Sequence, residues 1–152
     1  KFKQGYFDGD AFSRYQEVDG ERAMVFYTKI HKKYKYPEFD NEKFLTEAVV
    51  WNRMANDGYK IRYYNDIIWI YEYKGDGLTM AGHQLFINNP RGYGLWLKET
   101  CYFTTNSLVK RIQMYYSFFS DLKGFYEIKE IREFINMPLF YYGCCILLDK
   151  LN

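Results

Sequence analysis

Residues 46–64 read TEAVVWNRMANDGYKIRYY and contain a complete helix pattern, its stop signal and a strand pattern. Between residues 46 and 57, apolar residues recur at spacings of three and four, with Trp51 on the apolar face, which predicts a helix. Gly58 is suited to end this helix because glycine readily adopts the left-handed conformation found just after helices. The run YKIRYY at 59–64 then favours a strand. We therefore expect the chain to combine helices with strands.

The residues before this stretch have mainly loop and strand character. Residues 1–20 are rich in Gly and Asp, which predicts a loop with at most one short strand. The apolar run AMVFYT at 23–28 predicts a buried strand, and a short basic helix or turn follows that ends before Pro37. The lysines of that turn, at 29–35, are typical of a solvated helix end.

The residues after this stretch change from strand to helix patterns. IIWIYEY at 67–73 predicts a further strand, and KGDGLT at 74–79 predicts a loop. Beyond Met80 only helical patterns occur, interrupted at 88–92 and after Gly124. We predict an α+β fold with a boundary between a first part, residues 1–79, and a helical subdomain, residues 80–152.

Composition narrows the classes of function. The 152 residues are 26% charged and 48% hydrophobic, which is ordinary for a globular domain. The formal net charge of +2 gives no field that would make nucleic acid an expected partner. Aromatic residues reach 22%, which suits carbohydrate-binding or interface surfaces, although an AT-rich genome explains the same bias.

The three cysteines have no zinc-ligand spacing, and the adjacent Cys144 and Cys145 are poorly placed to bridge each other. We expect them, with Cys101, to be reduced thiols of a cytoplasmic protein. No apolar run has the length of a bilayer-spanning helix. Attachment to the inner face of a membrane is the alternative that stays open.

Six fragments follow one another along residues 15–100: GER at 20–22, YPEF at 36–39, EKFLTE at 42–47, IYEY at 70–73, DGLT at 76–79 and NPRGY at 89–93. Each fragment alone is a weak signal, but their order makes the match more specific. Together they resemble the second half of bacterial family-two glycosyltransferases.

The resemblance implies a GT-A architecture, in which an N-terminal half binds a nucleotide sugar and a divalent metal, Mg²⁺ or Mn²⁺, through an Asp-x-Asp motif. Asp8-Gly9-Asp10 has these letters but lacks the preceding nucleotide-binding units, so we interpret it as a chance match. The chain begins with Lys1. We expect it to be the acceptor-side part of a longer enzyme, inactive alone, with metal and donor bound mainly outside it.

Glu47 matches the acidic residue that acts as general base in this family. A carboxylate there would take the proton of a sugar or lipid-linked acceptor hydroxyl while the nucleotide diphosphate leaves from the opposite face, which inverts the anomeric carbon. The alternative is that Glu47 only complements the positive end of a helix dipole. Ala48 follows it, where the family often has a second acid.

Three further positions are candidates for substrate binding. Trp51 lies four residues after Glu47 and could stack on a sugar ring or pack in the core. Asp76 and Thr79 lie in a loop that could close over the donor or form a solvated turn. His83 is a weak candidate for a metal ligand, because a single histidine on a helix more often packs or faces solvent.

The helical tail mixes aromatic and aliphatic residues with lysine and arginine. Such faces could lie on an anionic membrane, but helix packing or a homodimer contact fits the same residues. A non-catalytic α+β interaction module that docks through this tail is therefore the alternative to an enzyme fragment.

Overall fold

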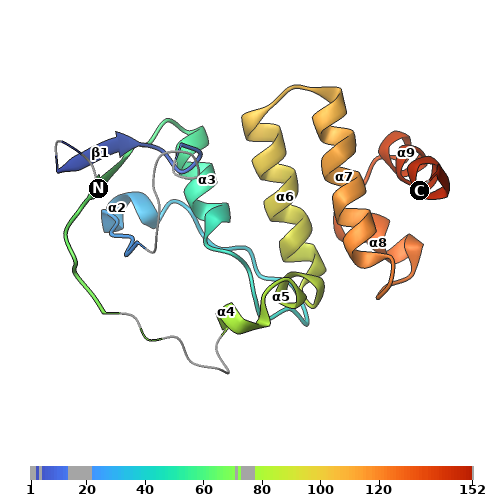
Figure 1. The fold of residues 1–152 in the computed structure, drawn as a ribbon, viewed down its shortest axis with the longest axis horizontal. Helices are drawn as coiled ribbons and strands as arrows, with labels where there is room; N and C mark the ends of the chain where they lie inside the picture. Colours follow the sequence, from blue (N-terminus) through green and yellow to red (C-terminus); the bar gives the residue numbers. More distant parts are fainter. Residues whose placement is uncertain (1–2, 4, 14–21, 71, 73–77, 152) are drawn as a thin grey trace.

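The structure, a computed structural model, describes residues 3, 5–13, 22–70, 72 and 78–151. The described part is α+β, as the sequence predicts. A two-stranded sheet and two helices form the N-terminal portion, and helices alone follow from residue 78 onward (Figure 1).

The sheet joins two segments that are far apart in the sequence. β1 (Tyr6–Gly9) pairs antiparallel with β2 (Ile61–Tyr64), so that Tyr6 lies opposite Tyr64 and Gly9 opposite Ile61. On the buried face Tyr63 packs against Phe7, with ring centroids 6.0 Å apart. The short strand expected within residues 1–20 and the strand expected within 59–64 are thus both present.

Between these strands, the described residues form two helices. α2 (Thr28–His31) is a single turn, as the basic segment before Pro37 predicts. α3 (Ala48–Asn56) buries Val49, Val50 and Met54. The predicted stop is confirmed, because Gly58 has a φ of +88°.

Six helices make up the remainder of the described chain: α4 (Leu78–Ala81), α5 (Gln84–Ile87), α6 (Pro90–Thr104), α7 (Leu108–Leu122), α8 (Ile128–Phe134) and α9 (Leu139–Leu151). The expected break near 88–92 falls at residues 88–89, and Pro90 occupies the first turn of α6, where its missing N–H removes no helical bond. The Ser107 hydroxyl caps α7 by accepting a hydrogen bond from the Lys110 backbone N–H at 3.4 Å.

The main core lies among α6, α7, α8 and α9, and α7 is its centre (Figure 1). Tyr115, Phe118, Phe119 and Leu122 of α7 are fully buried. The Tyr115 ring stacks on Tyr141 of α9 at 4.6 Å. A helix in this segment, as the pattern beyond Met80 predicts, is confirmed, and these four residues form the face that α7 turns to its neighbours.

The N-terminal portion is joined to the helices through α3 and α6. The Arg53 guanidinium donates two hydrogen bonds to the Glu99 carboxylate, at 2.8 and 2.7 Å. At the adjacent positions, the buried Asn52 amide donates to the Thr100 hydroxyl at 2.8 Å. These side-chain bonds between α3 and α6, called the seam below, cross the boundary predicted between residues 79 and 80. The division of the chain into two parts at this boundary stays a prediction.

Two strand predictions are wrong. Residues 22–27 form no strand, and α2 begins at Thr28. Residues 65–70 form none either, and Ile67 and Ile70 are 90% and 97% exposed. A strand needs a neighbouring chain to bond its backbone, and in the described part of the protein β1 and β2 pair only with each other. Tyr71 and Tyr73 lie outside the described residues.

Candidate functional site

Glu47 occupies the N-cap position of α3 and is exposed. Its side chain makes no capping hydrogen bond. Instead the Thr46 hydroxyl accepts a long hydrogen bond, 3.4 Å, from the Ala48 backbone N–H. The helix dipole still favours a carboxylate here, but the Glu47 carboxylate oxygens do not cap the helix.

An aromatic cluster lies beside Glu47. Burial, and after it the negative charge of Glu47, raise the pKa of the Tyr36 hydroxyl. The His31 ring lies between Tyr36 and Phe26, with centroid distances of 6.1 and 5.1 Å. These residues were missed as site candidates, because the sequence around 29–36 was interpreted as a solvated basic turn. The alternation of lysines with His31, Tyr34 and Tyr36 was the available signal.

Trp51 lines a cleft of about 870 Å³ beside α3. The opposite walls are residues 22–27, β2 and residues 65–69. The lining is mainly aromatic and aliphatic, with Arg22, Lys60 and Arg62 as its cations. A concave, largely apolar surface with a few polar groups is typical of a small-molecule site. Glu47 is not part of the lining and lies one helical turn before Trp51.

The two loop candidates cannot be placed beside this cleft. Asp76 lies outside the described residues. Thr79 lies in α4, not in the predicted loop, and only its backbone is described. Their role at the donor stays a prediction.

His83 lies just before α5, where it contacts a carboxylate and not a metal-binding cluster. Its Nε2 is 3.5 Å from Oδ2 of Asp121, which also accepts a 2.6 Å hydrogen bond from the Tyr93 hydroxyl. Burial, and then this bond, raise the pKa of Tyr93, so the hydroxyl stays protonated and donates. Across the described residues, no three side chains of His, Cys, Asp or Glu gather to hold a metal ion.

Asp8 and Asp10, the acids of the Asp-x-Asp letters, form ion pairs with residues of β2 and the position before it. Arg62 donates to both oxygens of Asp8 at 2.6 Å, and Lys60 donates to Asp10 at 2.9 Å. Asp10 also accepts hydrogen bonds from the backbone N–H groups of Phe12 and Ser13. The interpretation of Asp8-Gly9-Asp10 as a chance match to a metal motif stays a prediction.

The cysteines are free thiols in the structure. Cys145 is buried, and burial raises the pKa of its thiol to about 11. Such a thiol is protonated at neutral pH and acts as a small apolar residue in the α7–α9 contact.

Models of protein families, curated proteins and solved structures were all compared with this chain, and none matches. The resemblance to family-two glycosyltransferases rests on the collinear motifs alone. Within the described part, no helix is both long and apolar enough to cross a bilayer.

Proposed function

We propose that this chain is the acceptor-side part of an inverting family-two glycosyltransferase of the GT-A type, with Glu47 as its general base. The observation that carries the proposal is the placement of Glu47. The residue that matches the acidic position of the motifs is exposed at the start of α3, makes no capping bond, and precedes Trp51 by one turn. A base must be accessible to an incoming alcohol, and this carboxylate is.

The reaction needs one proton acceptor. As the acceptor hydroxyl oxygen forms a bond to the anomeric carbon, the Glu47 carboxylate takes its proton. The bond from the anomeric carbon to the nucleotide diphosphate breaks on the opposite face, and the electron pair leaves with the diphosphate. The product is a glycoside of inverted configuration.

Trp51 would bind the acceptor. Its indole forms part of the cleft wall one turn after Glu47, and the flat face of an indole stacks on the C–H face of a sugar ring. An acceptor in this cleft would extend its reacting hydroxyl toward the start of α3. The acceptor would be a sugar of a surface polysaccharide or a lipid-linked glycan, and the reaction would take place in the cytoplasm or at the inner face of its membrane.

The donor and metal would be held elsewhere. The described residues form no cluster of metal ligands, so they do not fit the Mg²⁺ or Mn²⁺ ion that the resemblance implies. No step above is routed through the ion. The donor-binding half and its metal would come from residues outside this chain.

Replacement of Glu47 tests the proposal. In a protein that includes the donor-binding half, Glu47→Gln should lower the rate of sugar transfer by about 10²–10⁴-fold, because the amide cannot accept the proton. Circular dichroism should show that the fold is retained. Glu38→Gln, at an exposed position of the preceding loop, is the matched control. An unchanged rate in Glu47→Gln would reject the base assignment.

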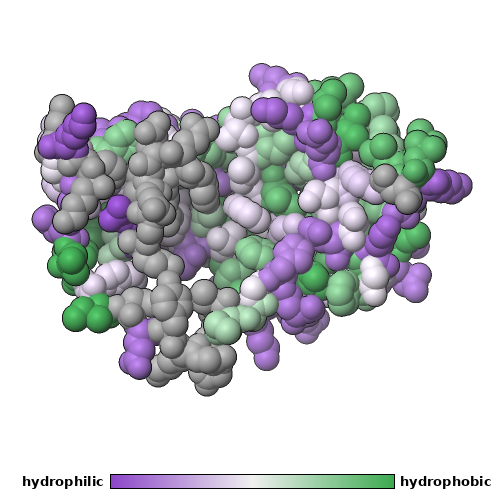
Figure 2. All heavy atoms as spheres, viewed as in Figure 1, coloured by the Kyte–Doolittle hydropathy of each residue, from purple (hydrophilic) through white to green (hydrophobic). Residues whose placement is uncertain are grey.

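A second candidate, a non-catalytic interaction module, is favoured by the exposed side of α9. Leu139, Leu147 and Leu151 are 71%, 60% and 75% exposed and recur at multiples of four residues. Figure 2 shows hydrophobic residues gathered over α9 at this end of the molecule. If docking through this side is the only function, Glu47→Gln leaves every measured property unchanged, whereas Leu147→Ser weakens self-association in sedimentation experiments.

A further inference from the structure

The loop that leads to α3 is bonded to the start of α6. Glu42 Oε1 accepts a hydrogen bond from the Arg91 backbone N–H at 2.7 Å, and Oε2 accepts one from the Gly92 N–H at 2.8 Å. These N–H groups belong to the first turn of α6 and have no partner within the helix. The helix dipole adds a favourable term for a carboxylate at this end. Glu42 therefore anchors the loop to α6.

Asn89 adds a second anchor beside the first. Its side chain is buried, and Oδ1 accepts hydrogen bonds from the backbone N–H groups of Lys43 and Phe44, at 2.8 and 3.1 Å. Its Nδ2 donates to the Leu85 carbonyl oxygen at 2.7 Å. One amide thus holds backbone groups of two segments that are more than forty residues apart. Removing it would leave these polar groups without their partner, which is costly where they are buried.

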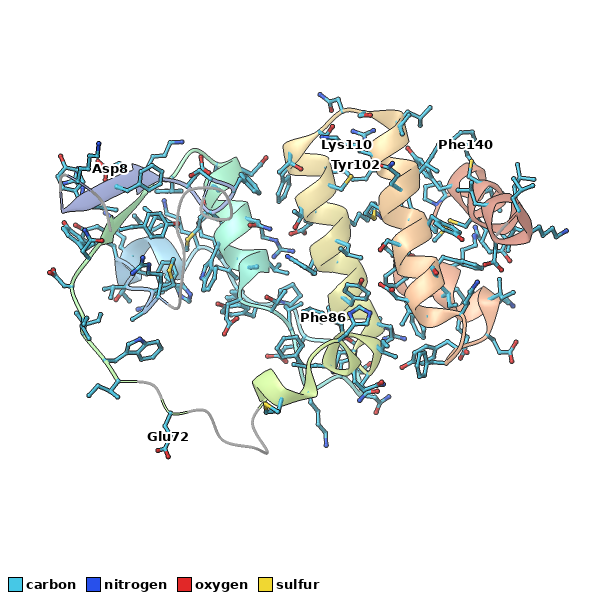
Figure 3. The ribbon with its side chains drawn as sticks, in the orientation of Figure 1. Asp8, Glu72, Phe86, Tyr102, Lys110 and Phe140 are labelled. Carbon is cyan, nitrogen blue, oxygen red and sulfur yellow. The ribbon has the colours of Figure 1, made fainter. Side chains whose placement is uncertain are left out.

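The fit between loop and helix leaves no spare room. A Cβ at Gly92 would lie 3.1 Å from both Leu45 Cδ1 and the Phe44 carbonyl oxygen. The Phe44 ring packs edge-on against Phe86, with centroids 5.5 Å apart and an interplanar angle of 84°. Figure 3 places Phe86 where α5 meets the start of α6. The loop is therefore fixed by packing as well as by hydrogen bonds.

We infer that Glu42 and Asn89 are positioning residues that, by holding residues 42–45 on the start of α6, fix the place at which Glu47 enters α3. The inference rests on the proposed function, since the position of Glu47 matters for the reaction only if Glu47 is the base. Glu47 follows the anchored loop after one residue, Thr46, whose carbonyl oxygen accepts a bond from the Val49 N–H at 3.2 Å. A shift of the loop is thus passed directly to the first turn of α3.

Hydrogen exchange in the 152-residue chain tests the anchor itself. Glu42→Ala and Asn89→Ala should each speed exchange of the Lys43 and Phe44 amide protons roughly tenfold or more, because the bonds that protect them open more often. Glu38→Ala and Asn88→Ala change the same residue types at exposed neighbouring positions and should leave this exchange as it is. Unaltered exchange in the Glu42 and Asn89 variants would overturn the inference, whatever the role of Glu47.

Kinetics test the consequence in a protein that includes the donor-binding half. Glu42→Ala should lower kcat by roughly 10–100-fold with an unchanged KM for the nucleotide sugar, because a base displaced by about 1 Å no longer reaches the hydroxyl. Glu42→Gln keeps one acceptor oxygen and should recover part of the loss. A kcat per folded molecule equal to that of the parent enzyme would refute the positioning role. Faster hydrogen exchange in the Glu42 and Asn89 variants, together with an unchanged rate of sugar transfer in Glu47→Gln, would instead refute the proposed function and leave only the anchor.

Discussion

The carboxylates of Asp8, Asp10, Glu42 and Glu47 show how differently the fold uses one functional group. Asp8 and Asp10 accept hydrogen bonds from Arg62 and Lys60 of the neighbouring strand and its approach. Glu42 accepts two bonds from the backbone of α6. Glu47 alone of the four is exposed at a helix start without a capping bond. The resemblance selects Glu47 as the candidate base, and its exposed position without a capping bond leaves the carboxylate free to take a proton in the proposed reaction.

Asp10 makes a pH prediction possible. The hydrogen bond from Lys60, followed by that from the Ser13 backbone N–H, lowers the pKa of Asp10 below its ordinary value of 3.8. A carboxyl whose pKa is lowered by folding stabilises the fold above its unfolded pKa, and this contribution fades as pH falls from there through the folded pKa. Thermal midpoints of the parent chain should therefore drop as the pH is lowered below 3.8.

Asp10→Asn supplies the comparison. The variant should be less stable than the parent at neutral pH, and the gap between the two midpoints should narrow in acid. Lys60→Met removes the main hydrogen-bond donor to Asp10. The difference in thermal midpoint between this variant and the parent should also narrow in acid. Parallel curves for parent and Asp10→Asn would show that the pair adds no pH-dependent stability.

Two glycines of long helices give a prediction at the level of elements. A Cβ at Gly94 of α6 would lie 3.0 Å from Ile135 Cβ and 3.2 Å from Phe118 Cε2. Gly94→Ala should destabilise the chain by about 1–3 kcal/mol, because the helices must move apart to admit the methyl group. Gly143 of α9 has nothing within 4 Å of its Cβ position. Gly143→Ala should stabilise by about 0.5–1 kcal/mol through helix propensity.

Denaturant unfolding of both variants measures these changes. The pair is matched, since each adds one methyl group to a helix interior and only the packing differs. Equal effects of the two substitutions would mean that the contact of α6 with α7 and with residue 135 is looser than described.

The helices could be predicted from sequence because their signals are local. The helical patterns beyond Met80 and the stop signal of Gly58 each depend on residues only a few positions apart. The structure accordingly has helices beyond Met80, and α3 ends just before Gly58. The strands expected at 23–28 and 67–73 depend on partners that local patterns do not reveal. Apolar, β-branched runs were the evidence for them, yet Ile67–Ile70 lies exposed without a neighbouring strand in the described part (Figure 2).

The candidate site follows the same rule. Glu47 and Trp51 share one helix, and their placement on α3 was predicted from spacing. The anchoring hydrogen bonds of Glu42 and Asn89 join residues that are 45–50 positions apart, and no pattern within either fragment indicates them. The cluster of Phe26, His31 and Tyr36 could not be predicted, because it depends on the direction that the chain takes after residue 31.

At the scale of the whole molecule, the seam between α3 and α6 decides whether the chain unfolds as one body. The sheet and α3 bury few large side chains of their own, whereas the main core lies among α6–α9. The Arg53–Glu99 pair is bidentate, and its side chains are only 27% and 21% exposed. Both features raise the contribution of an ion pair above that of an ordinary surface contact.

Removing this pair should separate two unfolding transitions. In Arg53→Met, the Glu99 carboxylate keeps its half-buried position without its cation, and the seam weakens. A double-mutant cycle with Glu99→Met should give a coupling energy of about 1 kcal/mol.

With Trp69 and Trp96 replaced by Phe, Trp51 fluorescence reports on α3 while far-ultraviolet circular dichroism reports mainly on α6–α9. The two signals should coincide in the parent, and in Arg53→Met the Trp51 transition should move to lower denaturant. Coincident transitions in both proteins would mean that the loop anchor at Glu42 and Asn89, and not the ion pair, couples the N-terminal portion to the helices.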